Sequence, residues 1–207
     1  MAVEPACFDG LYSASCRQAP RFETASGPRR LHLACGDHGK NGWINVDLFG
    51  PGADLPPDLR EPLPFSSNTI TEIYTEHFFE HLDYPNVLDS LGWNFETPNA
   101  PSEALLFLRE CRRVLAPGGV LDIVVPDAEG LIAEYVARRE VGFPMDRWWG
   151  PKWCDTPMHC VHYLFRQGRE HKYAYGEETL ARVLQSAGFV DVVRRSYDPA
   201  RATPRIT

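Results

Sequence analysis

Hydrophobic and polar positions form two kinds of pattern along the chain. Short apolar runs are typical of buried strands, and apolar residues three or four positions apart are typical of one face of a helix. Runs of the first kind predict strands at residues 31–34, 43–48, 70–75, 120–125 and 189–194, with a weaker candidate at 53–55. Helical segments separate several of these strands. The order therefore predicts an α/β fold with a doubly wound, mostly parallel sheet.

Three segments have helical spacing. The first covers residues 105–115 and is stopped by the sequence APGG, and the second follows Asp127, which can cap it. The third covers residues 180–187 and ends at Gly188. The sequence EHFFEHL, directly after the strand at 70–75, also looks helical.

Two stretches interrupt this alternation, and we interpret both as insertions. Residues 83–101 are rich in Pro, Asn and aromatic side chains, and residues 142–171 contain Trp148, Trp149, Trp153 and several histidines. In an open parallel sheet, ligands bind beyond the carboxyl ends of the strands, and both insertions leave the sheet on that side. We expect them to wall a ligand pocket, where the tryptophans either pack in the core or line the pocket.

Length and composition narrow the class of protein. With 207 residues, 43% of them hydrophobic, the chain has the size of one globular domain, residues 1–207. No apolar run approaches the ~18 residues of a membrane span, and the N-terminus lacks the pattern of a secretory signal. We therefore expect a cytoplasmic protein without a membrane partner, whose six scattered cysteines are free thiols. The net charge of −7 disfavours nucleic acid as a partner.

Two residues near the first strands have the chemistry of a nucleoside-binding site. Gly36 directly follows an apolar strand, so the backbone can approach a ligand there and its amide groups can meet a carboxylate. Asp47 ends the second strand and can accept hydrogen bonds from both hydroxyls of a ribose. The simpler interpretations are a tight turn for Gly36 and a helix cap or solvated acid for Asp47. A nicotinamide oxidoreductase is disfavoured because GxGxxG is not present.

Four stretches in order resemble the motifs of S-adenosylmethionine (SAM)-dependent methyltransferases of class I, specifically the type 11 methyltransferase domain family. They are LHLACGDHGKNGWINVDL, DLREPLPFSSNTITEIYTEHFFEHL, FLRECRRVLAPGGVLDIVVPD and EHKYAYGEETLARVLQSAGF. The resemblance covers about residues 30 to 197 and leaves residues 1–29 as an N-terminal extension without a counterpart. It implies a Rossmann-like fold and SAM as the cofactor.

The resemblance also implies which residues would contact SAM. Asp58 and Leu59 would lie against the adenine, although Asp54 could replace Asp58, and Glu76 and His77 would lie beside the methionine part. The complete set of expected cofactor-binding residues is Ala34, Cys35, Gly36, Asp47, Leu48, Asp58, Leu59, Glu76 and His77.

The sequence departs from the family pattern at two places. The distance from Gly36 to Asp47 is short, so the helix between the first two strands must be reduced to a turn. Only DPARATPRIT follows Tyr197, where the family's final strand should lie. We expect either that the sheet lacks its last antiparallel strand or that a partner covers that edge, a homodimer being one option.

Histidines are the candidates for removing a proton from a methyl acceptor, since they titrate near neutral pH. His77 and His171 are the predicted catalytic residues, with His81 as a further candidate. Cys154, His159, Cys160 and His162 contain metal-binding residue types, but without CxxC or HxxxH spacing we expect no metal.

The sequence therefore predicts methyl transfer from SAM to a small-molecule acceptor, at an oxygen or nitrogen atom. The alternative is a protein that binds SAM without turnover, as a partner or regulatory subunit.

Overall fold

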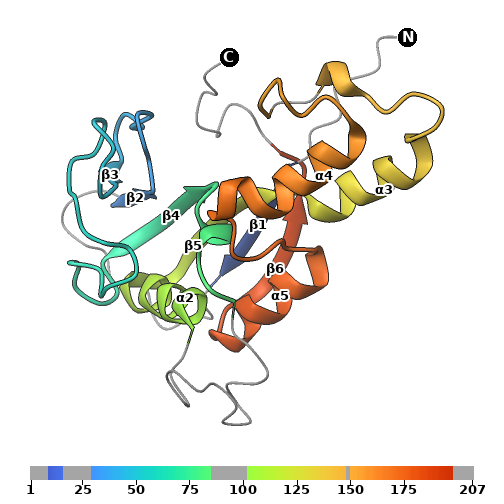
Figure 1. Ribbon diagram of the computed structural model, residues 1–207. Helices are drawn as coiled ribbons and strands as arrows, with labels where there is room; N and C mark the ends of the chain where they lie inside the picture. The colour runs from blue at the N-terminus through green and yellow to red at the C-terminus, as the bar shows by residue number, and fades with distance from the viewer. Residues whose placement is uncertain (1–8, 16–28, 85–101, 148–149, 198–207) are drawn as a thin grey trace, which may run out of the picture.

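A six-stranded sheet forms the centre of the protein in the computed structural model, which describes residues 9–15, 29–84, 102–147 and 150–197 (Figure 1). The strands are β1 (Asp9–Ser15), β2 (Arg30–Leu33), β3 (Ile44–Val46), β4 (Ile70–Glu76), β5 (Leu115–Pro126) and β6 (Val190–Arg195). The helices are α2 (Glu103–Val114), α3 (Ala128–Arg138), α4 (Pro157–Arg166) and α5 (Glu177–Ser186), with short 3-10 turns η1 (Phe79–His81), η2 (Met145–Arg147) and η3 (Gln167–Arg169).

The strand order is β3-β2-β4-β5-β1-β6. The four strands β3, β2, β4 and β5 pair in parallel, which confirms the predicted mixed α/β content and parallel sheet. β1 lies antiparallel between β5 and β6. We expected the sheet to lack its last antiparallel strand or a partner to cover that edge; instead, residues Asp9–Ser15 of the N-terminal extension form an antiparallel strand of the sheet.

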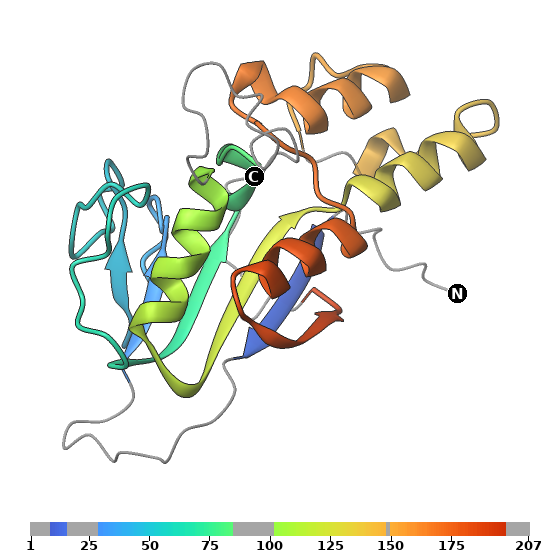
Figure 2. The ribbon, with the colours of Figure 1, turned by 90° about the horizontal axis from the view of Figure 1, so that it is seen from below.

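One face of the sheet is covered by α2 and α5, which lie side by side over it in Figure 2. Leu31, Ile73 and Ile123 point from the central strands into this layer and are completely buried. Helix α2 contributes Phe107 and Leu108 to the same core. Ser102 caps the helix by accepting a hydrogen bond from the Leu105 N–H, so the apolar stripe starts in register with the sheet.

Three local expectations were wrong. Helix α2 ends at Val114, before APGG as expected, but β5 starts at Leu115 and not at Val120, so APGG lies inside the strand, where a register shift against β4 and a positive φ of 78° at Gly118 form an irregularity. The weak strand at 53–55 is reduced to a single bridge between Val46 and Leu55. The segment EHFFEHL forms the short turn η1 instead of a regular helix.

The second predicted insertion, 142–171, contains α4, which packs on α3 through a small apolar cluster separate from the sheet core. Most of the first insertion, residues 85–101, lies outside the described residues, as do Trp148 and Trp149. Cys35, Cys111, Cys154 and Cys160 are buried free thiols, and Cys7 and Cys16 lie outside the described residues. Among the described helices, none is long and apolar enough to cross a membrane.

Candidate functional site

Three of the predicted motifs meet at the carboxyl ends of neighbouring strands. In the parallel register, Leu33 at the end of β2 pairs with Val46 on one side and with Thr75 on the other. The residues that follow these three positions are Ala34, Asp47 and Glu76. They therefore lie in one row along the edge where an open parallel sheet binds its ligands.

The Asp47 carboxylate joins the loops that follow β2 and β3. One oxygen, Oδ2, accepts a hydrogen bond from the Gly36 N–H at 2.9 Å. The other, Oδ1, accepts from the N–H groups of Phe49 at 2.8 Å and Gly50 at 2.7 Å. Since a carboxylate has about four acceptor positions, about one remains. Asp47 thus orders this edge and keeps one position for a ligand, fewer than the two expected from the sequence.

The same loops approach each other so closely that Gly50 needs to be glycine. A Cβ atom built on Gly50 would lie 2.3 Å from the Gly36 carbonyl oxygen. The backbone also adopts left-handed φ at Ala34 (54°), Gly36 (53°) and His77 (54°), all just after parallel strands. Such conformations are costly for residues other than glycine and gather at functional sites, so the edge has the backbone character of a binding site.

The remaining predicted cofactor residues differ in exposure and in partners. Asp58 is paired with Arg60, whose guanidinium Nε lies 3.0 Å from Asp58 Oδ1 and lowers the pKa of that carboxyl to about 2. Asp54 accepts hydrogen bonds from the backbone and side chain of Asn45, at 2.7 and 3.1 Å, so it holds β3 in place. Leu59 and Cys35 are buried, and Leu48 is exposed.

Glu76, at the end of β4, is held by two tyrosines. Tyr74 donates to Glu76 Oε2 at 2.8 Å, and Tyr197 donates to Oε1 at 3.1 Å. Burial, together with the Glu76 charge, strongly raises the pKa of the Tyr74 hydroxyl, which keeps this donor protonated. Glu76 is almost completely buried, so its carboxylate is fixed at the edge of the site.

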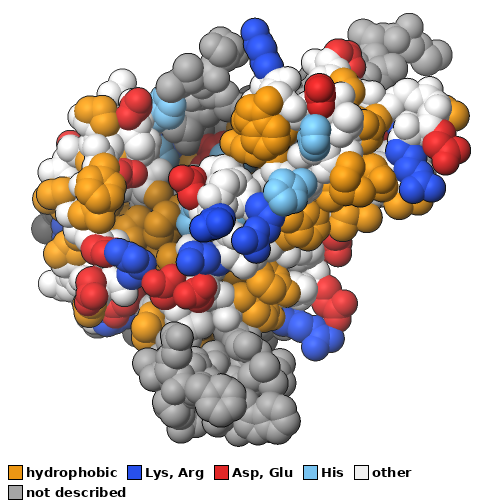
Figure 3. Space-filling view, in the orientation of Figure 1, with side chains coloured by type: hydrophobic (Ala, Val, Ile, Leu, Met, Phe, Trp, Pro, Cys, Tyr) orange, Lys and Arg blue, Asp and Glu red, His pale blue; other side chains and the backbone are white. Residues whose placement is uncertain are grey.

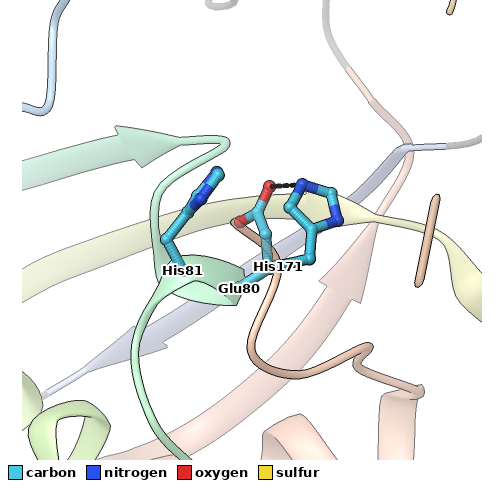
Figure 4. Close-up of side chains that lie close together, drawn as sticks. All are labelled: Glu80, His81 and His171. Carbon is cyan, nitrogen blue, oxygen red and sulfur yellow. Dashed lines mark ion pairs between the residues drawn. The ribbon is translucent and has the colours of Figure 1, made fainter. Parts of the chain in front are cut away.

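Beyond Glu76, three histidines gather around Glu80 on the turn η1. His77 Nδ1 lies 3.3 Å from Glu80 Oε1, and His171 Nε2 lies 3.9 Å from the same oxygen. The rings of His81 and His171 meet edge to face, with centroids 4.8 Å apart. Figure 4 shows Glu80 between His81 and His171, with the ion pair between Glu80 and His171 dashed. The structure thus brings the three predicted histidines together.

The segment after α4 places His171 in this cluster. The backbone N–H groups of Lys172 and Tyr173 both donate to the Glu80 carbonyl oxygen, at 2.8 and 3.1 Å. Tyr175 stacks on Phe79, with ring centroids 5.0 Å apart. Hydrogen bonds and aromatic packing therefore fix the chain around His171 against η1.

The histidines differ in their environment. The His171 side chain is 2% exposed, and its Nδ1 donates to the Leu164 carbonyl oxygen. Burial lowers the pKa of His171, so the neutral ring is favoured. The His77 side chain is 32% exposed. Burial lowers the pKa of His77, but its hydrogen bond to Glu80 and the charges of Glu80 and Glu76 outweigh this effect and raise it.

The surface is hollowed at this end of the sheet, between the part that carries β2 and β3 and the part that carries α4, as Figure 3 shows. Histidine and acidic side chains are visible there, in pale blue and red. Trp153, from the predicted pocket wall, is 58% exposed and contacts His159 and Tyr163 on α4. It therefore belongs to the surface of the α3–α4 unit and not to the core.

Glu80 is the residue that the sequence analysis missed. The signal was the repeat of Glu-His in EHFFEH, which places a second acid and a second histidine four residues after Glu76 and His77. Within the described residues, the group with metal-ligand geometry is Glu80, His81 and His171, and the Cys154–His162 segment does not form one.

Comparison of the sequence with models of known protein families and with curated proteins gives no match.

Proposed function

We propose that the chain binds SAM at the carboxyl edge of β2, β3 and β4 and transfers its methyl group to a small-molecule acceptor. The observation that carries this proposal is the row of Ala34, Asp47 and Glu76 on adjacent parallel strands. Ala34 and Asp47 belong to the first stretch of the resemblance and Glu76 to the second, and the sheet register brings the three to one edge.

The proposed role of each residue follows from the hydrogen-bond acceptor positions or the open space that remain at it. Asp47 has about one acceptor position left, so it would take one ribose hydroxyl rather than two. The turn at Gly36 has no atom within 4 Å of a Cβ position, so a ligand can approach its backbone closely. Methyl transfer from a sulfonium is an in-line displacement, in which alignment supplies most of the rate. The assignment of His77 and His171 as bases stays a prediction.

We also propose that the sheet is the doubly wound sheet of class I methyltransferases, with β1 as its antiparallel strand. Both faces are buried, as that arrangement requires, because His32 and Tyr74 on the second face are as inaccessible as Leu31 and Ile73 on the first. The described helices α2 and α5 both lie on the first face.

The test is binding of S-adenosylhomocysteine to the full chain, measured by calorimetry and by the melting temperature. We expect a rise that corresponds to about 2.7 kcal/mol at 100 times Kd, and none with NAD. Asp47→Ala should weaken binding by about 1.5–3 kcal/mol, the range for hydrogen bonds to a charged group. Asp155→Ala, at an exposed position just before α4, is the matched control and should bind like the unchanged chain.

Two outcomes would count against the proposal. No saturable binding of S-adenosylhomocysteine would overturn it, and equal affinity in folded Asp47→Ala would place the ribose elsewhere. Circular dichroism of each variant without ligand shows whether the Asp47 loops are still folded. Release of S-adenosylhomocysteine from SAM, with candidate hydroxyl and amine acceptors, separates an enzyme from a protein that only binds SAM.

A further inference from the structure

Two imidazoles and one carboxylate converge beside the proposed SAM site, on parts of the chain that are far apart in sequence. One potential ligand atom from each of Glu80, His81 and His171 lies within 4.8 Å of the other two (Figure 4). Glu80 and His81 come from η1, and His171 follows η3. We infer that Glu80, His81 and His171 form a binding site for a divalent cation of the zinc type.

The spacing is close to that of a coordination site. With bonds of about 2.0–2.2 Å to nitrogen and oxygen, the ligand atoms of a tetrahedral site lie roughly 3.4 Å apart. His171 Nε2 and Glu80 Oε1 are 3.9 Å apart, too far for a direct hydrogen bond and near enough for a shared ion. Small rotations of the three side chains would bring the ligand atoms to the spacing of a coordination site.

His171 already has the orientation of a metal ligand. Its Nδ1–H donates to the Leu164 carbonyl oxygen, so the lone pair is on Nε2, the atom that faces Glu80. Metal-bound histidines usually make this second hydrogen bond to a carbonyl or carboxylate, which fixes the tautomer and the ring.

Glu80 supplies the second, independent sign of a ligand. Its side chain is 1% exposed, and among the described residues no group donates a hydrogen bond to its Oε2. Leaving a charged oxygen buried without a partner costs several kcal/mol, so natural structures rarely keep one unsatisfied. His77 approaches only the other oxygen, Oε1. A cation bound by both carboxylate oxygens, with Oε1 on the side of His171, would satisfy Oε2 and offset the buried charge.

The donor set decides the class of cation. Magnesium and calcium prefer oxygen ligands, whereas two imidazoles with a carboxylate suit zinc and iron(II). Three protein ligands also leave a coordination position for water or a substrate atom. The simpler interpretation is a buried ion pair in which a protonated histidine faces Glu80. That interpretation predicts no bound metal, so the two are separable.

The test uses the full chain without a histidine tag, stripped with a chelator and dialysed. Titration with Co²⁺ is followed by its visible absorption, and Zn²⁺ is then added to displace it, with metal content measured by mass spectrometry. We expect one equivalent of Co²⁺, with the spectrum of nitrogen and oxygen ligands, and full displacement by Zn²⁺. SAM is not needed for this measurement, so its result is independent of the proposed function.

His81→Gln is the deciding variant because His81 is only half-buried and its replacement should leave the fold intact. Loss of outer-sphere partners alone lowers metal affinity about 10–100-fold, so we expect a fall of more than about 100-fold in His81→Gln, Glu80→Gln and His171→Gln. His159→Gln, in an exposed pair with Asp155, should keep the original affinity. Wild-type affinity in folded His81→Gln, no stoichiometric binding, or absorption bands of thiolate ligands would each overturn the site.

Discussion

The two faces of the central sheet are both buried, but they are built from opposite kinds of side chain. Toward α2 and α5, the central strands present Leu31, Ile73 and Ile123. On the other face, the residues next to these in sequence are His32, Tyr74 and Asp122, and they are equally inaccessible. Burial of apolar side chains alone stabilises the first face. On the second face, a buried polar group loses its hydrogen bonds to water and costs free energy unless the protein replaces them.

The difference coincides with the position of the candidate site. The polar face continues along β4 to Glu76, which accepts hydrogen bonds from Tyr74 and Tyr197. The apolar face continues to Phe79, which packs against Phe107 of α2 and carries the turn η1. One face therefore supplies most of the free energy of folding, and the other holds a charged group at the edge of the candidate site.

The largest effect is expected on the apolar face, from Phe107→Ala. Phe107 is fully buried and contacts the rings of Phe78 and Phe79, with centroids 5.4 and 6.0 Å away. Removing a buried aromatic ring leaves a cavity and should lower the free energy of unfolding by about 3–5 kcal/mol. Denaturant unfolding measures the change. As a control, Ile132→Ala on the exposed side of α3 should change the free energy of unfolding by no more than about 0.5 kcal/mol. A similarly small loss in Phe107→Ala would contradict the view that burial on the apolar face stabilises the fold.

The apolar face is also the part of the fold that the sequence predicts best. Its strands follow from apolar runs, and α2 and α5 follow from three- and four-residue spacing, because burial on one face imposes these periods. The sequence does not predict the position of β1 in the sheet, because DGLYSAS has few apolar residues and its partners in β5 and β6 lie more than 100 residues away. Pairing between such distant segments leaves no local signal.

A pH-dependent effect is expected on the polar face, at His32. Burial and then the nearby Lys40 lower the pKa of His32 to about 4 from its ordinary value of 6.5. The folded pKa is below the unfolded one, so the unfolded chain binds more protons between these values and stability falls as pH falls through this window. Between pH 7.5 and pH 5, the titration of His32 should lower the free energy of unfolding by about 2 kcal/mol.

His32→Leu removes this titration while keeping a buried side chain of similar size. Urea unfolding of both proteins at several pH values gives the difference, in which the contributions of the other histidines cancel. The variant should lose about 2 kcal/mol less than the unchanged chain between pH 7.5 and 5. Parallel pH profiles would mean that His32 is solvated in solution, and the second face would then not be closed.

The sequence could predict only those residues of the candidate site whose position follows from the direction of the strands. Ala34, Asp47 and Glu76 lie at the carboxyl ends of their strands, and these ends share one edge in a parallel sheet, so their neighbourhood could be inferred. The cluster around Glu80 could not, because His171 is brought there by the hydrogen bonds of Lys172 and Tyr173 to the Glu80 carbonyl. The capture of Asp47 by three backbone N–H groups was equally invisible, since it depends on the shape of two loops.

The smallest effect is expected from Tyr197→Phe, where the polar face reaches the edge of the site. The change removes one hydroxyl that donates to Glu76 Oε1 at 3.1 Å and leaves the Tyr74 donor on Oε2. Tyr197 is half-buried, so water can partly replace it, and we expect a loss of about 1 kcal/mol by denaturant unfolding. Tyr135→Phe on α3, remote from Glu76, is the control for removal of a phenol. A loss of several kcal/mol would mean that Glu76 is sealed from water, as Ile73 is on the apolar face. No loss would mean that solvent already reaches the carboxylate, and the polar face would then be open at the end where the proposed ligand binds.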